Sequence, residues 1–152
     1  MTRFLAFILI NFILTSNTTS SDIEIFRRNY SKASTDKLLC EDMIVQLTKL
    51  KDKEALFLGY LGAYQTAYAN HVFSPFSKLK TFKQGKSNIQ AAISKDKNDV
   101  ELRYIRLSIQ KNAPSFLGYN DNINEDVNFI KAHLKEVDSK VLLNNIEYLL
   151  KK

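Results

Sequence analysis

The sequence predicts an all-α protein built as an antiparallel array of six or seven helices. Apolar residues recur at helical spacing along most of the chain, and short polar breaks separate the periodic stretches. Glycine and proline are scarce, with four and two among 152 residues. A sandwich or barrel of many short strands needs such turn residues at regular intervals, so the composition disfavours that class.

The N-terminal residues have the layout of a secretory signal peptide. Arg3 precedes an apolar run over residues 4–14, and a stretch of small polar residues follows it. Because a helix that spans a bilayer needs about 20 apolar residues, the short run predicts a cleaved leader. We therefore expect residues 1–20 to be a signal peptide and residues 21–152 to form one exported domain, periplasmic or extracellular. The alternative is a buried N-terminal helix, which leaves Arg3 and the Ser/Thr run unexplained.

Three helices are predicted in the first half of the chain. Thr35 or Asp36 can cap the second, and Asp52 can cap the third. Gly59 and Gly62 each cost the third helix about 1 kcal/mol relative to alanine, so their presence predicts close packing of a neighbouring helix. The three helices cover residues 22–33, 36–50 and 53–72.

A fourth helix is predicted over residues 75–95. Ser74 is a good N-cap, and Pro75 suits the first helical position because its missing N–H is not needed there. Gly85 is expected on a lightly packed turn of this helix. Asn98, with a glutamate three residues after it, predicts a capping box for the next helix.

The segment 100–110 fits two kinds of secondary structure. Leu102, Ile105 and Ile109 share one helical face, whereas the residues near its start also alternate as in a strand. No partner strand is evident elsewhere, so we predict a helix. After an apolar loop, the last two helices are expected to begin at Asn122 or Asn124 and at Asp138 or Ser139.

Part of the chain resembles a tetratricopeptide-repeat helical pair. The run from Phe82 to Arg103 is similar to the second helix of such a repeat leading into the next, and Gly59 to Tyr64 is similar to the glycine and tyrosine positions of a first helix. The resemblance implies a tetratricopeptide-like pair within the array. Only one unit is visible, so a regular repeat array is not expected.

The chain also resembles a group of small exported proteins of Bacteroidetes-type bacteria. Residues 62–64, 101–110 and 114–119 carry this resemblance. It implies export and an all-α fold, and it implies no particular activity.

Four polar residues on the fifth helix form one candidate site: Glu101, Arg103, Arg106 and Gln110. The two arginines and the glutamine share a stripe flanked by apolar positions, so they should be half buried and hydrogen-bonded. One interpretation is a structural network that holds the 112–124 loop. The alternative is a small anionic-ligand pocket, or an enzyme site, that uses the planar fork of arginine. The acidic residues within reach of a structural network are Asp121 and Glu125.

We expect the protein to be a non-catalytic helical scaffold or protein-interaction domain in the cell envelope. Its partner would be a protein, held by exposed aromatic side chains on and after the third helix. Nucleic acid is not expected as a partner, and membrane contact is expected only through an uncleaved signal segment. The candidate partner surface comprises Tyr60, Tyr64, Tyr68 and Phe73.

The formal net charge of +6 is concentrated most densely at Lys78, Lys80, Lys83 and Lys86. We interpret these lysines as the solvated face of an amphipathic helix. The alternative is a patch for phosphate or lipid headgroups.

The sequence suggests no metal ion, cofactor or catalytic residue. His71 and His133 lie far apart, and no Cys-x-x-Cys or His-x-x-x-His spacing is present. Cys40 is the only cysteine and lies on an apolar helical face, so a buried structural thiol is expected.

Overall fold

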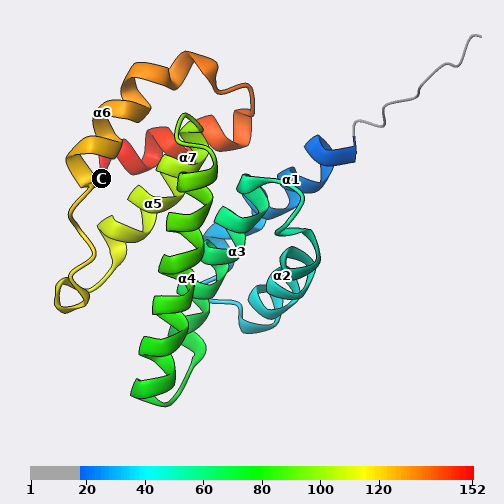
Figure 1. Ribbon diagram of the computed structural model, residues 1–152, viewed down its shortest axis with the longest axis vertical. Helices are drawn as coiled ribbons and strands as arrows, with labels where there is room; N and C mark the ends of the chain where they lie inside the picture. The colour runs from blue at the N-terminus through cyan, green and yellow to red at the C-terminus, as the bar shows by residue number, and fades with distance from the viewer. Residues whose placement is uncertain (1–17) are drawn as a thin grey trace, which may run out of the picture.

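The computed structural model describes residues 18–152, and this part of the chain folds into seven α-helices with no strand (Figure 1). The all-α prediction is confirmed, including a helix in the ambiguous segment after residue 100. Short 3-10 turns follow α1, α3 and α6 and precede α6. The helices are α1 (Thr18–Asn29), α2 (Lys37–Leu50), α3 (Ala55–Tyr68), α4 (Pro75–Lys95), α5 (Val100–Asn112), α6 (Ile123–His133) and α7 (Lys140–Lys151).

The predicted signal peptide lies almost entirely outside the described residues. Helix α1 already begins at Thr18, so the expected boundary between residues 20 and 21 falls within this helix. The signal peptide therefore stays a prediction.

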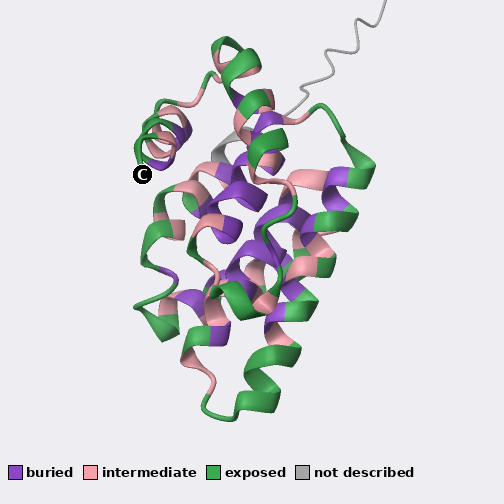
Figure 2. Ribbon diagram, turned by 90° about the vertical axis from the view of Figure 1, so that its left-hand side faces the viewer, coloured by how far each residue is buried: buried purple, intermediate pink, exposed green. Residues whose placement is uncertain are grey.

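Helices α3 and α4 form an antiparallel pair at the centre of the fold, and the other helices pack around them. Helix α2 contacts α3, α5 lies against both α3 and α4, α6 packs on α5, and α7 contacts α1 and α5. Buried side chains from all seven helices form one connected cluster, which runs through the middle of the molecule (Figure 2).

Two glycines allow α3 and α4 to approach at backbone distance. A Cβ atom on Gly62 would lie 2.5 Å from the carbonyl oxygen of Gly85, and one on Gly85 would lie equally close to the carbonyl oxygen of Gly62. Gly59 is similarly closed by the side chain of Leu102. The predicted close packing at Gly59 and Gly62 is confirmed, whereas the lightly packed turn expected at Gly85 is wrong, because Gly85 is buried at this crossing.

Helix caps match the prediction at some helices and differ at others. Asp36, Ser74 and Ser139 each accept a hydrogen bond from a backbone N–H of the helix that follows. Asp52 is not a cap, because α3 starts two residues later than expected and Asp52 pairs instead with the neighbouring lysine. Asp99 takes the role expected of Asn98.

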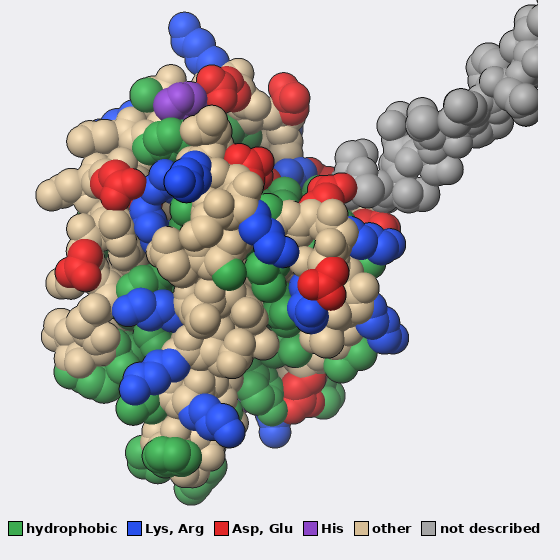
Figure 3. All heavy atoms as spheres, viewed as in Figure 1, with side chains coloured by type: hydrophobic (Ala, Val, Ile, Leu, Met, Phe, Trp, Pro, Cys, Tyr) green, Lys and Arg blue, Asp and Glu red, His purple; other side chains and the backbone are tan. Residues whose placement is uncertain are grey.

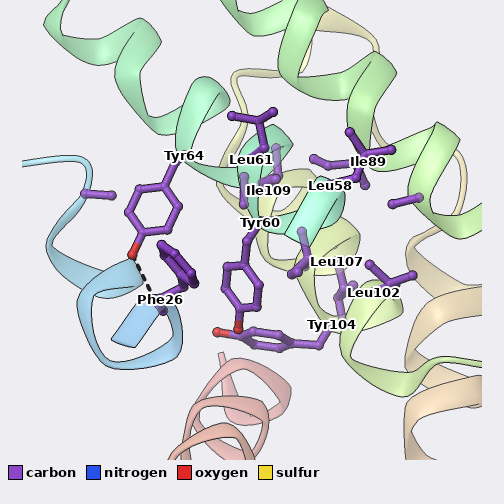
Figure 4. Packing of buried hydrophobic residues seen from close by; sticks show 14 of the residues in the cluster. Phe26, Leu58, Tyr60, Leu61, Tyr64, Ile89, Leu102, Tyr104, Leu107 and Ile109 are labelled. Carbon is purple, nitrogen blue, oxygen red and sulfur yellow. Dashed lines mark hydrogen bonds between the residues drawn. The ribbon is translucent and has the colours of Figure 1, made fainter. Parts of the chain in front are cut away.

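An aromatic cluster fills the space between α1 and α3 (Figure 4). The ring of Phe26 packs edge to face on Phe57 and Tyr64, with ring centroids 6.2 and 6.4 Å apart. The Tyr64 hydroxyl donates a hydrogen bond of 2.8 Å to the backbone oxygen of Phe26. Burial raises the pKa of Tyr64 well above its usual range, so its hydroxyl stays protonated and continues to donate.

Candidate binding groove

The two arginines of the fifth helix are held by carboxylates on α6. Arg106 is buried and binds Asp126 with a bidentate fork, its Nε donating to Oδ2 at 2.7 Å and its Nη2 donating to Oδ1 at 2.6 Å. Asp126 is itself fully buried. Burial alone would lower the pKa of Arg106, but the hydrogen bonds to Asp126 outweigh it and raise that pKa.

Arg103 also binds carboxylates of α6, at the edge of this contact. Its Nη1 donates to Glu125 at 2.7 Å and lies 3.3 Å from Asp126, and its Nη2 donates to the backbone oxygen of Lys97. The guanidinium also lies 5.0 Å from the ring centroid of Phe129. The pKa of Glu125 is lowered, first by its hydrogen bond from Asn122 and then by Arg103.

Glu101 belongs to a different network, on the other side of α5. It accepts hydrogen bonds from Arg27 of α1 and, at 2.6 Å, from the hydroxyl of Tyr60 of α3. Arg27 also pairs with Glu24, which in turn accepts from Ser139 before α7. This network joins four segments that are far apart in the sequence.

Gln110 does not join either network. Both polar atoms of its buried side chain lack a hydrogen-bond partner among the described residues, and so does the hydroxyl of Tyr119. The four polar residues expected to act together therefore divide into an Arg103–Arg106 contact with α6, a separate Glu101 network, and an isolated glutamine. With both guanidinium groups paired to carboxylates, the geometry argues against an anion pocket or enzyme site at Arg103 and Arg106.

The expected aromatic partner surface is not present as a patch. Tyr60 and Tyr64 are almost fully buried in the core. Tyr68 is half-buried, and its hydroxyl donates to Glu41 of α2 at 2.6 Å. Only Phe73 is fully exposed. The helical face that carries the tyrosines is the one that packs against α1 and α2, which the spacing of aromatic residues alone does not reveal.

A groove of about 800 Å³ takes the place of that surface as the candidate site. It is lined by residues of the turn after α1, the end of α3 with the turn after it, the first turns of α4, α5 from Tyr104 onward with the loop after it, and the end of α7. Its apolar wall includes Leu79, Phe82, Ile109 and Leu117, and the large side chains of Phe116 and Tyr148 are 84% and 73% exposed beside it.

The polar groups of the groove are neutral or positive. Tyr30 and Ser108 lie within hydrogen-bond distance at 3.0 Å, and burial raises the pKa of Tyr30 to about 12, so this hydroxyl stays neutral. The charged side chains that line the groove are Lys78 and Lys152, and no Asp or Glu lines it among the described residues. Lys152 donates to the side-chain oxygen of Asn112 at 2.6 Å.

Sequence reasoning missed this groove because five separate segments build it. Each contributes three to eight residues, and none of them shows an unusual pattern by itself. One signal was present: the loop after Pro114 is apolar, with Phe116 and Leu117, and it returns to the rest of the fold at this wall.

The potentially reactive side chains of the described residues are engaged elsewhere. Cys40 is buried, and burial raises the pKa of its thiol to about 12. His71 and His133 each have one ring nitrogen 2.8 Å from a backbone oxygen. No group of three or more His, Cys, Asp or Glu side chains in the described part of the chain is placed to hold a metal ion. Within residues 18–152, no helix combines the length and apolar character needed to cross a bilayer.

No family model, no curated protein and no solved structure matches this chain.

Proposed function

We propose that the protein is a non-catalytic helical binding domain of the cell envelope, and that its groove holds an apolar segment of a protein partner with acidic residues beside it. The groove itself carries this proposal. The envelope location rests on the order of positive, apolar and small polar residues at the N-terminus.

The shape of the groove favours a peptide segment as its occupant. Sites for small ligands enclose 70–90% of the ligand surface, whereas a helix laid in a groove keeps one side in water. This groove is bordered by the exposed rings of Phe116 and Tyr148, and aromatic rings of that kind carry much of the binding energy in protein interfaces.

The charge of the groove favours acidic residues next to the apolar anchors. Lys78 and Lys152 contribute positive charge to the lining, and no Asp or Glu among residues 18–152 lines the groove and would repel an acidic partner. The buried hydroxyls of the wall already have hydrogen-bond partners: Ser108 lies against Tyr30, and Thr66 donates to the backbone oxygen of Ala63. They therefore need no hydrogen bond from the bound segment.

A peptide selection against the purified protein tests this proposal. We expect displayed random peptides to be enriched for Leu, Phe or Ile at i, i+3 or i+4 spacing with flanking Asp or Glu. The affinity of an enriched synthetic peptide would then be measured by calorimetry. Ala67→Phe and Ala113→Phe place a ring inside the groove and should weaken binding at least about tenfold, which corresponds to 1.4 kcal/mol.

Ala91→Phe is the matched control, because Ala91 is exposed on α4 and does not line the groove. It should leave the affinity unchanged. Failure to enrich any peptide class would overturn the proposal, and so would equal affinity of enriched peptides for the groove-filled and control variants.

A further inference from the structure

The connection between α3 and α4 forms one end of the long axis of the molecule (Figure 1). Phe73, in this connection, is fully exposed, and Phe76, in the first turn of α4, is 78% exposed. Large aromatic side chains are rarely left in water in this way without a partner. Hydrophobic side chains cover this end of the surface, and Lys and Arg side chains lie directly above them (Figure 3).

The residues around these two rings are positively charged. Lys78, Lys80 and Lys83 follow within two turns of α4 and are all exposed. Over residues 55–95, which include both helices, the sequence contains five lysines and no Asp or Glu. Within the described part of the chain, these three lysines form no ion pair with a carboxylate. We call Phe73, Phe76, Lys78, Lys80 and Lys83 the α3–α4 tip.

We propose that the α3–α4 tip docks the folded domain on the surface of an anionic lipid bilayer. The two phenylalanine rings enter the interfacial region, where aromatic side chains are stabilised. The lysines remain at the level of the phosphates, where each adds attraction to negatively charged lipids. Two positions at the start of α4 need no hydrogen bond from water at this surface: the backbone N–H of Ser77 donates to the Ser74 side chain, and Pro75 has no N–H.

The convex shape of the tip favours a bilayer over a folded protein as its partner. Phe73 and Phe76 belong to the connection and first turn at the end of the α3–α4 pair, both side chains are exposed, and neither residue lines the groove. Protein interfaces bury their aromatic anchors in pockets and surround them with a rim. Two protruding rings within a cluster of lysines instead suit a fluid, negatively charged surface that adapts to them.

This contact shares only Lys78 with the proposed protein-binding groove, whose lining contains neither phenylalanine nor the other two lysines. It also differs from the expectation that only an uncleaved signal segment touches a membrane. Because the tip belongs to the folded domain, the contact would persist after any leader is removed. The lysines that we first interpreted as a solvated helical face then have a binding role.

A single-tryptophan reporter tests the proposal in the full chain, which has no natural tryptophan. Phe76→Trp should show a blue-shifted emission and quenching by brominated lipids on vesicles of equimolar phosphatidylglycerol and phosphatidylcholine. The shift should be absent on phosphatidylcholine alone and weaken in about 0.5 M salt. Ile25→Trp, at a 46% exposed position on α1 that belongs to neither the tip nor the groove, should show neither response.

Removing a lysine or the Phe73 ring from the tip should weaken the binding of the protein to anionic vesicles. In the Phe76→Trp background, Lys80→Gln with Lys83→Gln should lower the apparent vesicle affinity by about 25-fold, or roughly fivefold for each lysine. Phe73→Ala should lower it about fivefold or more. Lys131→Gln with Lys135→Gln removes the same charge from exposed positions on and after α6 and should have a much smaller effect.

Two outcomes would overturn the proposal. One is an unshifted Phe76→Trp emission on the anionic vesicles, because binding through any other part of the chain leaves this reporter in water. The other is an equal loss of affinity in the Lys80/Lys83 and Lys131/Lys135 variants. That result would show that vesicle binding depends on the net charge of the protein and not on the position of the lysines. Peptide binding in the groove should be unaffected by Phe73→Ala, so the two proposals fail independently.

Discussion

The α3–α4 pair and the α5–α6 pair achieve helix packing in opposite ways. Helices α3 and α4 meet at backbone distance through Gly62 and Gly85, without any charge at the crossing. Helices α5 and α6 meet through a buried ion pair, Arg106 with Asp126. In the second pair the charges neutralise each other and are closed to ligands. In the α3–α4 pair, Lys78, Lys80 and Lys83 are exposed and pair with no carboxylate of residues 18–152, so this is the region where we expect binding to anionic partners.

Removing Asp126 should have the largest effect on stability. Asp126→Ala leaves the Arg106 guanidinium buried without its partner, and loss of one member of a buried pair costs about 3–5 kcal/mol. Urea unfolding followed by circular dichroism would measure this change. The matched variant Glu125→Gln should cost far less, because the Glu125 side chain is 56% exposed.

A double substitution separates the value of the pair from the cost of breaking it. Arg106→Met with Asp126→Leu should recover most of the stability lost in Asp126→Ala, since well-packed apolar residues often replace a buried pair without loss. If the double variant were as unstable as the single one, the ion pair itself would be required to align α5 and α6.

The glycine crossing should give the next largest effect. Replacement of a glycine by alanine inside an exposed helix normally stabilises the helix by about 1 kcal/mol. In Gly62→Ala the new Cβ would lie 2.5 Å from the Gly85 oxygen and 2.7 Å from Ile89, so overpacking should give a net loss of about 1–3 kcal/mol. Gly118→Ala, at a positive φ of 56° with open space around it, should cost only about 1–2 kcal/mol. A stabilising Gly62→Ala would show that the two helices do not approach at backbone distance.

Alkaline pH should weaken the apolar contact between α2 and α3. The Cys40 thiol lies 3.4 Å from the backbone oxygen of Tyr64, and burial raises the pKa of the thiol from 9.0 to about 12 on folding. The unfolded chain therefore loses this proton first, and stability that is complete below pH 9 should fall as the pH approaches 12, by at most about 1.4 kcal/mol per pH unit from this group. Tyr30 and Tyr119 add the same trend from pH 10 upward.

A Cys40→Ala variant identifies the thiol contribution. Its free energy of unfolding should decline less steeply than that of the natural sequence between pH 9 and 10, before the tyrosines titrate. Native Cys40 should also resist alkylation by iodoacetamide at pH 8 and react only after unfolding. Rapid alkylation of the native protein would contradict the buried position.

Local features of the sequence predicted the helices well, but they did not predict what the helices face. Ser74 and Pro75 mark the start of α4, and the periodicity of Leu102, Ile105 and Ile109 identifies α5 as a helix, because caps and apolar spacing are properties of neighbouring residues. The structural interpretation of the two α5 arginines matches the contacts at Glu125. The arginines hold α6 rather than the 112–124 loop, however, and their main partner is Asp126 rather than Asp121.

The candidate groove and the true position of the aromatic residues depend on contacts that are distant in sequence. Tyr60 lies against Glu101 and Tyr64 against Phe26, so a stripe of tyrosines that resembles a binding face is instead part of the core. Helix α3 is apolar around its whole circumference, and periodicity then carries no information about which side is exposed.

Removing lysines from the α3–α4 tip should have the smallest effect on stability, and this result would complete the contrast between the two helix pairs. Lys80→Gln with Lys83→Gln should leave the urea midpoint unchanged, because these exposed side chains form no ion pair within the described part of the chain and contribute nothing to the core. Because like charges along α4 repel one another, a slight increase in stability at low salt is the only change expected. A loss of stability comparable with that of Gly62→Ala would show that the lysines hold the fold together, and their exposure would then need another explanation than binding.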